Sequence, residues 1–397
     1  MDGARRTLFR GWSVVLPELE GPPEQGARPE ADALAKRGLR PVVRVAVVGA
    51  GVAGLACARM LREHDVDAVV FDKGRAPGGR LASWRSPELN ADLGAQYFTV
   101  RDHRFDRVVR SWLDDGTVAP WRGRIRARPS RGGDVVDIPP IDRFVGTPSM
   151  SALARHLGRD MGVRVRHRVD AIERRGTSYA LAGTVGAPGV TLGPREASSG
   201  VPLVAFGTFD RLVVFLPPEQ TSALVRHASP TLADAAARVD FEPCLAFAFA
   251  PDDDVLRDIP FDGLFVGRDG DPDRVIAWLA RDSSKPGRAA RESWVVHAAP
   301  GWSRAHLRDG RDDIERALLE EMARVVGVPR VGAKATWLHR WAFARPLSPL
   351  QVGALFDDDA KIGVGGDWSA GGRVEGAYLS GIALAGRVLG LPAEPAS

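Results

Sequence analysis

The stretch "VAVVGAGVAGLACARMLREHDVDAVVFD", residues 45–72, decides the fold of this 397-residue chain. A β-branched apolar run ends in glycine, an apolar segment of helical character follows, and a second apolar run ends at Asp72. A strand, a helix and a strand within about thirty residues match the length that a βαβ unit requires. The stretch therefore predicts a parallel sheet of Rossmann type at the start of the folded body.

The glycines of this stretch follow the GxGxxG spacing. Gly49 allows a tight turn, Gly51 lets the backbone approach a pyrophosphate, and Gly54 lets the helix pack closely on the strand. Asp72 ends the second strand, where its carboxylate can accept hydrogen bonds from both hydroxyls of a ribose. The strand, the helix and the acidic residue together favour a dinucleotide site over glycines that only form a turn. The predicted contacts of this stretch also include Ala53 and Lys73.

A second glycine pair distinguishes between cofactors. "DKGRAPGGRLASW", residues 72–84, places Gly78 and Gly79 directly before Arg80. A nicotinamide dehydrogenase would continue here through regular βα units, whereas a glycine loop with arginine suits the longer FAD, with Arg80 beside the pyrophosphate. Without the two glycines, Arg80 would be interpreted as a solvated surface residue. "ADLGAQYFT", residues 91–99, follows and supplies further predicted cofactor contacts: Gly94, Ala95, Gln96 and Tyr97.

A third glycine-rich stretch, "GVGGDWSAGGRVEGAYLSG", occupies residues 363–381. FAD is too long for one phosphate loop, so this stretch is expected to bind the flavin end of the cofactor. A helix beginning here would point its positive end at the N1–C2 carbonyl edge of the flavin. Asp367 would bond a ribitol hydroxyl or a water on the pyrophosphate, and Glu375 is expected to turn away from the flavin, toward Arg373. The predicted cofactor contacts are Asp367, Gly376 and Ala377.

Composition excludes several classes of function. Hydrophobic residues make up 44% and charged residues 26% of the chain, as in ordinary globular proteins, and the formal net charge is only +4. Arginines are interleaved with acids, so nucleic-acid binding is not suggested. Cys57 and Cys244 lie far apart in apolar segments and are expected to be reduced, and no His/Cys spacing suggests a metal site. No run has the length of a membrane span or a signal peptide, so the expected location is the cytoplasm.

The order of these segments predicts an α/β fold in which a Rossmann-type FAD-binding domain carries an inserted mixed-sheet α+β substrate domain. Stretches such as "CLAFAFA" and "SWVVHAA" alternate like strands with one buried face, and the chain returns to α/β character at "KIGVGGDW". Residues 183–207 suggest an irregular excursion. The predicted parts are a mobile N-terminal extension at 1–42, a discontinuous FAD-binding domain at 43–100, 145–225 and 355–392, and a substrate domain at 101–144 and 226–354.

Five motifs in this order resemble the bacterial renalases: "DKGRAPGGR", "LGAQYFTVRDHRF", "WLARDSSKPGR", "WVVHAAPGWS" and "GDWSAGGRVEGAYLSG". The resemblance covers about residues 43–390. Renalases belong to the broader group of monoamine-oxidase-like flavoproteins, which have the p-hydroxybenzoate hydroxylase type of fold. The resemblance implies an FAD oxidase that converts 2- or 6-dihydro isomers of NAD(P)H to NAD(P)+, while dioxygen becomes hydrogen peroxide. The C-terminal motif lacks the cysteine that carries flavin in some amine oxidases, so FAD is expected to be noncovalent.

The substrate site is expected to consist of side chains that stack on the substrate. Hydride transfer from an electron-rich dihydropyridine needs neither a nucleophile nor a general base, and no Ser-His-Asp or Cys-His arrangement is evident. Core packing is the alternative for each aromatic residue. Arg281 and Lys285 could attract substrate phosphates or face solvent, and Lys285 is comparable with the lysine that holds a water near flavin N5 in amine oxidases. The catalytic candidates are Tyr97, Trp278, His297, Trp302 and Arg345.

A flavin amine oxidase, or a desaturase that acts on a secondary metabolite, is the alternative function. An amine site should show an aromatic cage, whereas a dinucleotide substrate needs a wide entrance and basic residues. The expected partners are a dihydronicotinamide dinucleotide and dioxygen, with neither nucleic acid nor membrane.

Overall fold

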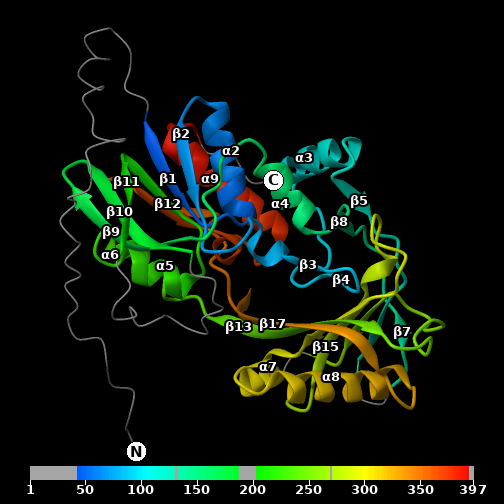
Figure 1. Cartoon of the computed structure of the whole chain (residues 1–397). Coiled ribbons are helices and arrows are strands. Elements are labelled where there is room, and N and C mark those ends of the chain that lie inside the picture. Colours follow the sequence, from blue (N-terminus) through cyan, green and yellow to red (C-terminus); the bar gives the residue numbers. More distant parts are fainter. Residues whose placement is uncertain (1–42, 130–132, 187–202, 269–270, 393–397) are drawn as a thin grey trace, which may run out of the picture.

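The structure is a computed structural model that describes residues 43–129, 133–186, 203–268 and 271–392 (Figure 1). The predicted N-terminal extension and the centre of the predicted excursion at 183–207 lie outside the described residues.

A five-stranded sheet, called the parallel sheet below, carries the order β18-β19-β12-β1-β2. Its neighbours pair in parallel except at the edge strand β18. The chain enters through the βαβ unit, returns to the sheet at β12 and returns again at β18, so β12 lies between the first strands of the fold and the last. The strands are β1 (Arg44–Val48), β2 (Asp67–Phe71), β12 (Arg211–Val214), β18 (Ala354–Asp357) and β19 (Ile362–Gly365).

Two helices cover one face of the parallel sheet, α2 (Val52–Glu63) and α9 (Val374–Leu389) (Figure 1). They approach closely because α9 carries small residues: a Cβ on Gly381 would lie 2.2 Å from the carbonyl oxygen of Ala53. The first and last motifs of the chain therefore meet at the same edge of the sheet.

An antiparallel meander packs on the opposite face of the parallel sheet, where Phe206 and Phe209 join the same core as Val48 and Leu212. Residues 183–185 and 204–207 are regular strand, so the irregular excursion predicted for 183–207 is wrong at both of its ends. The elements on this side are β9 (His167–Arg175), β10 (Ser178–Val185), β11 (Val204–Phe209), α5 (Pro218–Val225) and α6 (Pro230–Ala236).

A seven-stranded sheet, called the mixed sheet below, has the order β17-β13-β16-β15-β14-β6-β7. All its pairs are antiparallel except β14 with β6. Two helices, α7 (Pro300–His306) and α8 (Arg311–Val326), cover its outer face (Figure 1). The strands are β6 (Ile125–Arg128), β7 (Val136–Asp137), β13 (Phe241–Pro251), β14 (Gly263–Val266), β15 (Ile276–Arg281), β16 (Trp294–Ala298) and β17 (Ala333–Pro346).

Alternation along β13 separates the two faces of the mixed sheet. Leu245, Phe247 and Phe249 pack with α8 in the outer core. Ala248 and its neighbours Ala246 and Ala250 point to the inner face, toward the parallel-sheet half of the molecule. Small side chains therefore occupy the centre of this face. The predicted fold class, a Rossmann-type domain with an inserted mixed-sheet domain, is confirmed.

Short elements join the two halves, and two helices differ from the predicted division. Helix α3 packs its Phe105 and Trp112 in the core of α2 and α9, although residues 101–144 were assigned to the substrate domain by their place in the sequence. Helix α6 packs under the parallel sheet, although residues 226–354 were also assigned to the substrate domain. The joining elements are β3 (Ser83–Arg85), β4 (Asn90–Asp92), α3 (His103–Asp114), β5 (Val118–Pro120), β8 (Phe144–Gly146) and α4 (Ser151–Leu157).

Candidate active site

Each glycine of the first motif has its own structural reason. Gly49 has a φ of +105°, and a Cβ there would lie 2.7 Å from the carbonyl oxygen of Phe215. A Cβ on Gly54 would lie 1.9 Å from the carbonyl oxygen of Gly49, so only glycine permits this helix to pack on the turn. A Cβ on Gly51 would meet no protein atom within 4 Å. Gly51 is therefore not required by packing, and its open side is where a cofactor can approach the backbone.

The second glycine loop presses against the first. The amide of Gly78 donates to the carbonyl oxygen of Ala50 at 2.8 Å, and a Cβ on Gly79 would lie 3.6 Å from Cα of Gly51. Helix α2 begins here with neither a capping side chain nor an acid in its first turn. Its first N–H groups therefore remain available to an anion. We call Gly49, Gly51, Gly54 and Gly79 the glycine cradle.

Asp72 holds the cradle in shape. Its two carboxylate oxygens accept hydrogen bonds from the amides of Ala50 at 2.7 Å and Gly74 at 2.6 Å. Burial raises the pKa of Asp72, and the two backbone bonds oppose that shift. Each oxygen keeps a further lone pair, so the predicted contact with a ribose remains compatible with this geometry. The neighbouring Lys73 donates to Gln220 at 3.2 Å.

Arg80 and Asp367 were each predicted to contact the cofactor, and the structure pairs them with each other. The guanidinium donates to both carboxylate oxygens, at 2.7 and 2.5 Å, and to the carbonyl oxygen of Ala344 at 3.2 Å. This bidentate pair joins the second glycine loop to the C-terminal motif and to the end of β17. It fixes the three segments that surround the predicted cofactor site.

The start of α9 depends on glycine as well. A Cβ on Gly376 would lie 1.8 Å from the carbonyl oxygen of Ala370, and no side chain caps the helix. Glu375 does not pair with Arg373 as expected. Its carboxylate accepts hydrogen bonds from the amides of Arg101 at 2.6 Å and Asp102 at 2.8 Å, because the N-terminus of α3 lies against it. Ala377 lies in the first turn and packs on the α2 core.

The segment "LGAQ" links the cradle to the mixed sheet. A Cβ on Gly94 would lie 1.9 Å from the carbonyl oxygen of Arg80, and the amide of Ala95 donates to the same oxygen at 2.9 Å. The amide nitrogen of Gln96 donates to the carbonyl oxygens of Asp92 at 2.6 Å and Gly94 at 3.1 Å. Gln96 is thereby held in one orientation beside the inner face.

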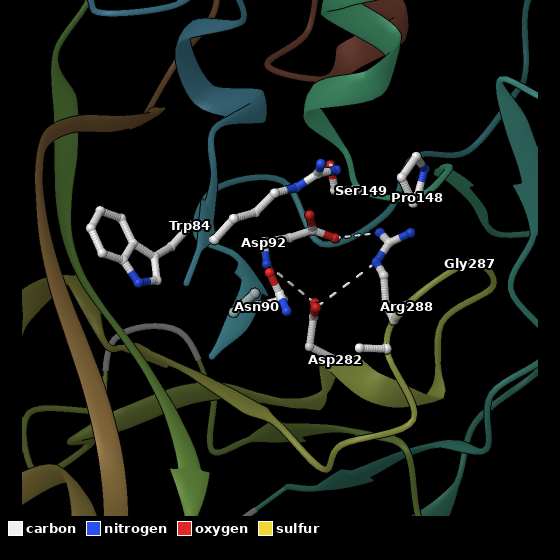
Figure 2. A pocket seen from close by; sticks show the side chains of 11 residues that line it. Trp84, Asn90, Asp92, Pro148, Ser149, Asp282, Gly287 and Arg288 are labelled. Atoms are coloured by element: carbon white, nitrogen blue, oxygen red, sulfur yellow. Dashed lines mark hydrogen bonds and ion pairs between the residues drawn. The ribbon is translucent and has the colours of Figure 1, made fainter. Parts of the chain in front are cut away.

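A buried ion cluster lies beneath Gln96 and comprises Asp92, Asp282, Lys285 and Arg288 (Figure 2 shows all but Lys285). The ammonium of Lys285 donates to Asp282 at 2.6 Å, to Gln96 at 3.1 Å and to Asp92 at 3.2 Å. These three bonds use all of its protons. Lys285 is therefore neither exposed to solvent nor free to hold a water in the way its comparison with amine oxidases implied.

The two carboxylates of the ion cluster titrate differently. Burial alone would raise the pKa of Asp92, but the charges of Lys285 and Arg288 outweigh it and the pKa is lowered. Burial raises the pKa of Asp282, and the charges of Lys285 and Arg288 offset only part of this increase. A cavity of about 200 Å³ borders the cluster between the β3–β4 hairpin and the start of α4 (Figure 2).

The register of the mixed sheet aligns five residues across its inner face, His339, Ala246, His297, Trp278 and Phe265, which we call the inner-face row. Nε2 of His297 lies 3.2 Å from the carbonyl oxygen of Leu93 and 3.5 Å from the amide nitrogen of Gln96. The indole of Trp341 donates to the same carbonyl of Leu93 at 3.0 Å. The predicted cofactor segment and the predicted catalytic strands therefore meet at His297.

Both histidines of the row are neutral at physiological pH. Burial lowers the pKa of His297 to about 4, and the charge of Lys285 acts in the same direction. Burial also lowers the pKa of His339 to about 4. The row thus offers aromatic and imidazole surfaces without a formal charge.

Tyr97 lies beside the row, within a group of aromatic rings. Its ring centroid is 5.9 Å from that of Trp278 and 6.1 Å from that of Trp121. The guanidinium carbon of Arg143 lies 5.2 Å from the Tyr97 ring, so a cation overlies this group. The indole of Trp278 is packed closely on two sides. The ring centroid of Phe265 lies 4.5 Å from that of Trp278, and the backbone of Gly263 is so near that a Cβ there would lie 2.6 Å from the indole.

Of the three other predicted substrate residues, one lies on the opposite face of the mixed sheet and two are held in ion pairs. Trp302 is on the outer face, in α7, 4.3 Å from the ring of His306, because the chain turns to that face at Pro300. Arg345 is half exposed and pairs with Glu242 at 2.7 Å. Arg281 donates to the carbonyl oxygens of Leu256 and Arg257 and also pairs with Glu292.

Sequence reasoning missed several residues that the structure brings to the site. Asp92 lies in the quoted stretch "ADLGAQYFT", and Asp282 lies in "WLARDSSKPGR" three residues before Lys285. The short spacing of Asp282 and Lys285 could have indicated an ion pair. The alternation of the strands identifies His339 and Phe265 as face residues, but not as neighbours of His297, because strand order was unknown. No local signal marked Arg143. Within the described part of the chain, no group of three or more His, Cys, Asp or Glu residues is arranged to hold a metal ion.

Comparison with known proteins agrees with this geometry. The family model described as flavin containing amine oxidoreductase matches residues 131–389, and the NAD(P)-binding Rossmann-like domain matches residues 47–114. Renalase of Mus musculus is 22% identical over 77% of this chain and 86% of its own length. None of the helices in the described ranges has the length and apolar character needed to cross a bilayer.

Solved structures show the same fold. Cyclohexylamine oxidase from Brevibacterium oxydans superposes with a TM-score of 0.65 at 13% identity, over 88% of this chain and 99% of that one. A triple mutant of putrescine oxidase superposes with a TM-score of 0.64 at 12% identity, over 88% of this chain and 100% of that one.

Proposed function

The chain belongs to the flavin containing amine oxidoreductase family, and from this premise we propose that it oxidises 2- or 6-dihydro isomers of NAD(P)H to NAD(P)+. Its cofactor is FAD, and the residues fit it, because the glycine cradle leaves Gly51 open while its neighbours are closed by packing. When bound, FAD supplies a two-electron acceptor that dioxygen can reoxidise, so the overall products would be NAD(P)+ and hydrogen peroxide. The 22% identity to renalase over most of both chains supports this substrate class.

The observation that carries the proposal is the absence of formal charge along the inner-face row. His297 and His339 are neutral at pH 7, and Lys285 has all its protons engaged. A dihydronicotinamide ring is neutral and can release a hydride without prior deprotonation. An amine arrives mainly as an ammonium ion and must lose a proton first, and none of the five residues of the row is a carboxylate that could balance its charge.

Different residues of the chain would bind the cofactor, contact the substrate and position these contacts. The glycine cradle and the first turn of α2 would bind the pyrophosphate of FAD, and the start of α9 would lie at its flavin end. Tyr97 would stack on the substrate, while Gln96 and the ion cluster would keep His297 in place. Arg143, above Tyr97, disfavours a cationic substrate and attracts an anionic one.

Oxygen consumption by the FAD-loaded enzyme tests the proposal. We expect rapid uptake with 6- or 2-dihydroNAD(P), one hydrogen peroxide for each NAD(P)+ formed, and no uptake with NADH, putrescine or cyclohexylamine. The apoprotein is the control for uncatalysed oxidation. Turnover of an amine without turnover of any dihydro isomer would replace the proposal with an amine oxidase.

A further inference from the structure

We propose that Trp278 and His297 form a carboxamide-recognition pair, with Nε1–H of the indole binding the carbonyl oxygen and Nδ1 of the imidazole accepting from the amide NH2. This inference rests on the proposed function, because the dihydronicotinamide ring carries a carboxamide. The two residues are cross-strand partners on β15 and β16, so they point to the same inner face.

The indole supplies a donor without a partner. Trp278 is 6% exposed, and among the described residues no acceptor reaches its buried Nε1. Burying an unpaired N–H is unfavourable, and buried polar groups are usually bonded to protein, water or ligand. The indole cannot turn to find another acceptor, because Gly263 and Phe265 hold its ring. A ligand with a carbonyl oxygen satisfies this group.

The imidazole supplies an acceptor. The carbonyl oxygen of Leu93 can only accept, so the proton of His297 resides on Nε2, which lies 3.2 Å from it. Since His297 is neutral at physiological pH, Nδ1 carries a lone pair. Trp341 donates to the same carbonyl oxygen, which holds Leu93 and thereby the orientation of the imidazole.

A primary carboxamide matches this pair and other groups do not. It offers one acceptor oxygen and one NH2 group with two donors, both bonded to the same carbon, and Trp278 and His297 are cross-strand partners. A methyl ketone satisfies the indole but leaves the imidazole lone pair unused, and an ammonium satisfies the imidazole but leaves the indole N–H unpaired. The pair would therefore select among pyridine nucleotides by the substituent on the ring.

Binding of three oxidised dinucleotides tests this selection without turnover. NAD+, its 3-acetylpyridine analogue and an analogue with an unsubstituted pyridinium ring are titrated into the FAD-loaded enzyme, with equilibrium dialysis as the readout. We expect affinity to fall in that order, by roughly 10-fold at each step for one buried hydrogen bond. Equal affinities for all three would overturn the inference.

Two variants test which residue is responsible for each of the two decreases in affinity. Trp278→Phe keeps an aromatic ring and should abolish the preference for the acetyl analogue over the unsubstituted one. His297→Leu should abolish the preference for NAD+ over the acetyl analogue. Trp302→Phe, the same change on the outer face of the sheet, should leave all three affinities unaltered. If Trp278→Phe binds the three ligands as the wild type does, the indole has no such role.

The outcome is separable from that of the proposed function. Carboxamide selectivity in an enzyme that oxidises no dihydro isomer would leave the recognition pair in place and refute the reaction. Oxidation of dihydro isomers without carboxamide selectivity would support the reaction and refute the pair.

Discussion

The glycine cradle and the inner-face row meet through Gln96, yet they are built by opposite means. The cradle consists of backbone that lies close together because side chains are missing, and its four glycines all lie within residues 49–79. The row consists of side chains that only the pairing of distant strands brings into line. The cradle therefore depends on whether one additional side-chain atom fits. The row depends on strand register and electrostatics.

The largest expected effect comes from filling the closed part of the cradle. Gly54→Ala places a Cβ 1.9 Å from the carbonyl oxygen of Gly49, and neither α2 nor the turn can yield without losing its packing. We expect a loss of more than about 4 kcal/mol of unfolding free energy or a failure to fold. Thermal unfolding of the apoprotein measures it. A variant with the wild-type Tm would mean that the helix has room to move.

This difference in construction explains what the sequence could predict. The spacing of Gly49, Gly51 and Gly54 is dictated by local backbone geometry, so the cradle followed from it. Trp302 and His297 stand close together in the sequence, but the chain turns at Pro300 and places them on opposite faces of the sheet. Strands β14, β15 and β16 pair in sequence order, but β13 pairs with β16 and β17 rather than with β14, so the alignment of His297 with Ala246 and His339 was not predictable.

The ion cluster joins the two regions, and breaking it should have the next largest effect. Lys285→Met leaves Asp92 and Asp282 buried with only Arg288 as counter-charge. We expect a loss of about 3–5 kcal/mol, because an uncompensated charge is then left in the interior. Urea unfolding compares this variant with Lys334→Met, which alters an exposed lysine. Equal stability of the two variants would show that the cluster contributes nothing.

Filling the open side of the cradle should separate binding from packing. Gly51→Ala adds a Cβ that meets no protein atom within 4 Å, so the apoprotein should keep its Tm within a few degrees. The affinity for FAD should fall by roughly 10-fold or more, because the methyl group stands where the cofactor approaches the backbone. Fluorescence titration of apoprotein with FAD measures this fall. Unchanged affinity would place the pyrophosphate elsewhere.

The row predicts a pH dependence of stability. The pKa values of His297 and His339 are about 4 in the fold against 6.5 for the free side chain, so the unfolded chain binds more protons between these values. Their contribution to stability is complete above about pH 6.5 and is lost as the pH falls toward 4. The double variant His297→Gln, His339→Gln should show a shallower fall in Tm over this range. An identical pH profile would contradict the assigned burial of the two rings.

The smallest effects are expected outside both regions. Arg345→Gln removes a half-exposed ion pair with Glu242, which contributes at most about 1 kcal/mol. Turnover of the dihydro isomers by this variant should remain within about twofold of the wild type. A large loss would return Arg345 to the substrate site.

Anaerobic mixing of the FAD-loaded enzyme with one equivalent of substrate tests most directly whether cradle and row form one site for dihydronicotinamide oxidation. We predict that 6- or 2-dihydroNAD(P) removes the absorbance of oxidised flavin within a single turnover and yields one equivalent of NAD(P)+, whereas amines leave the absorbance unchanged. Bleaching by an amine, with the dihydro isomers inert, would contradict it.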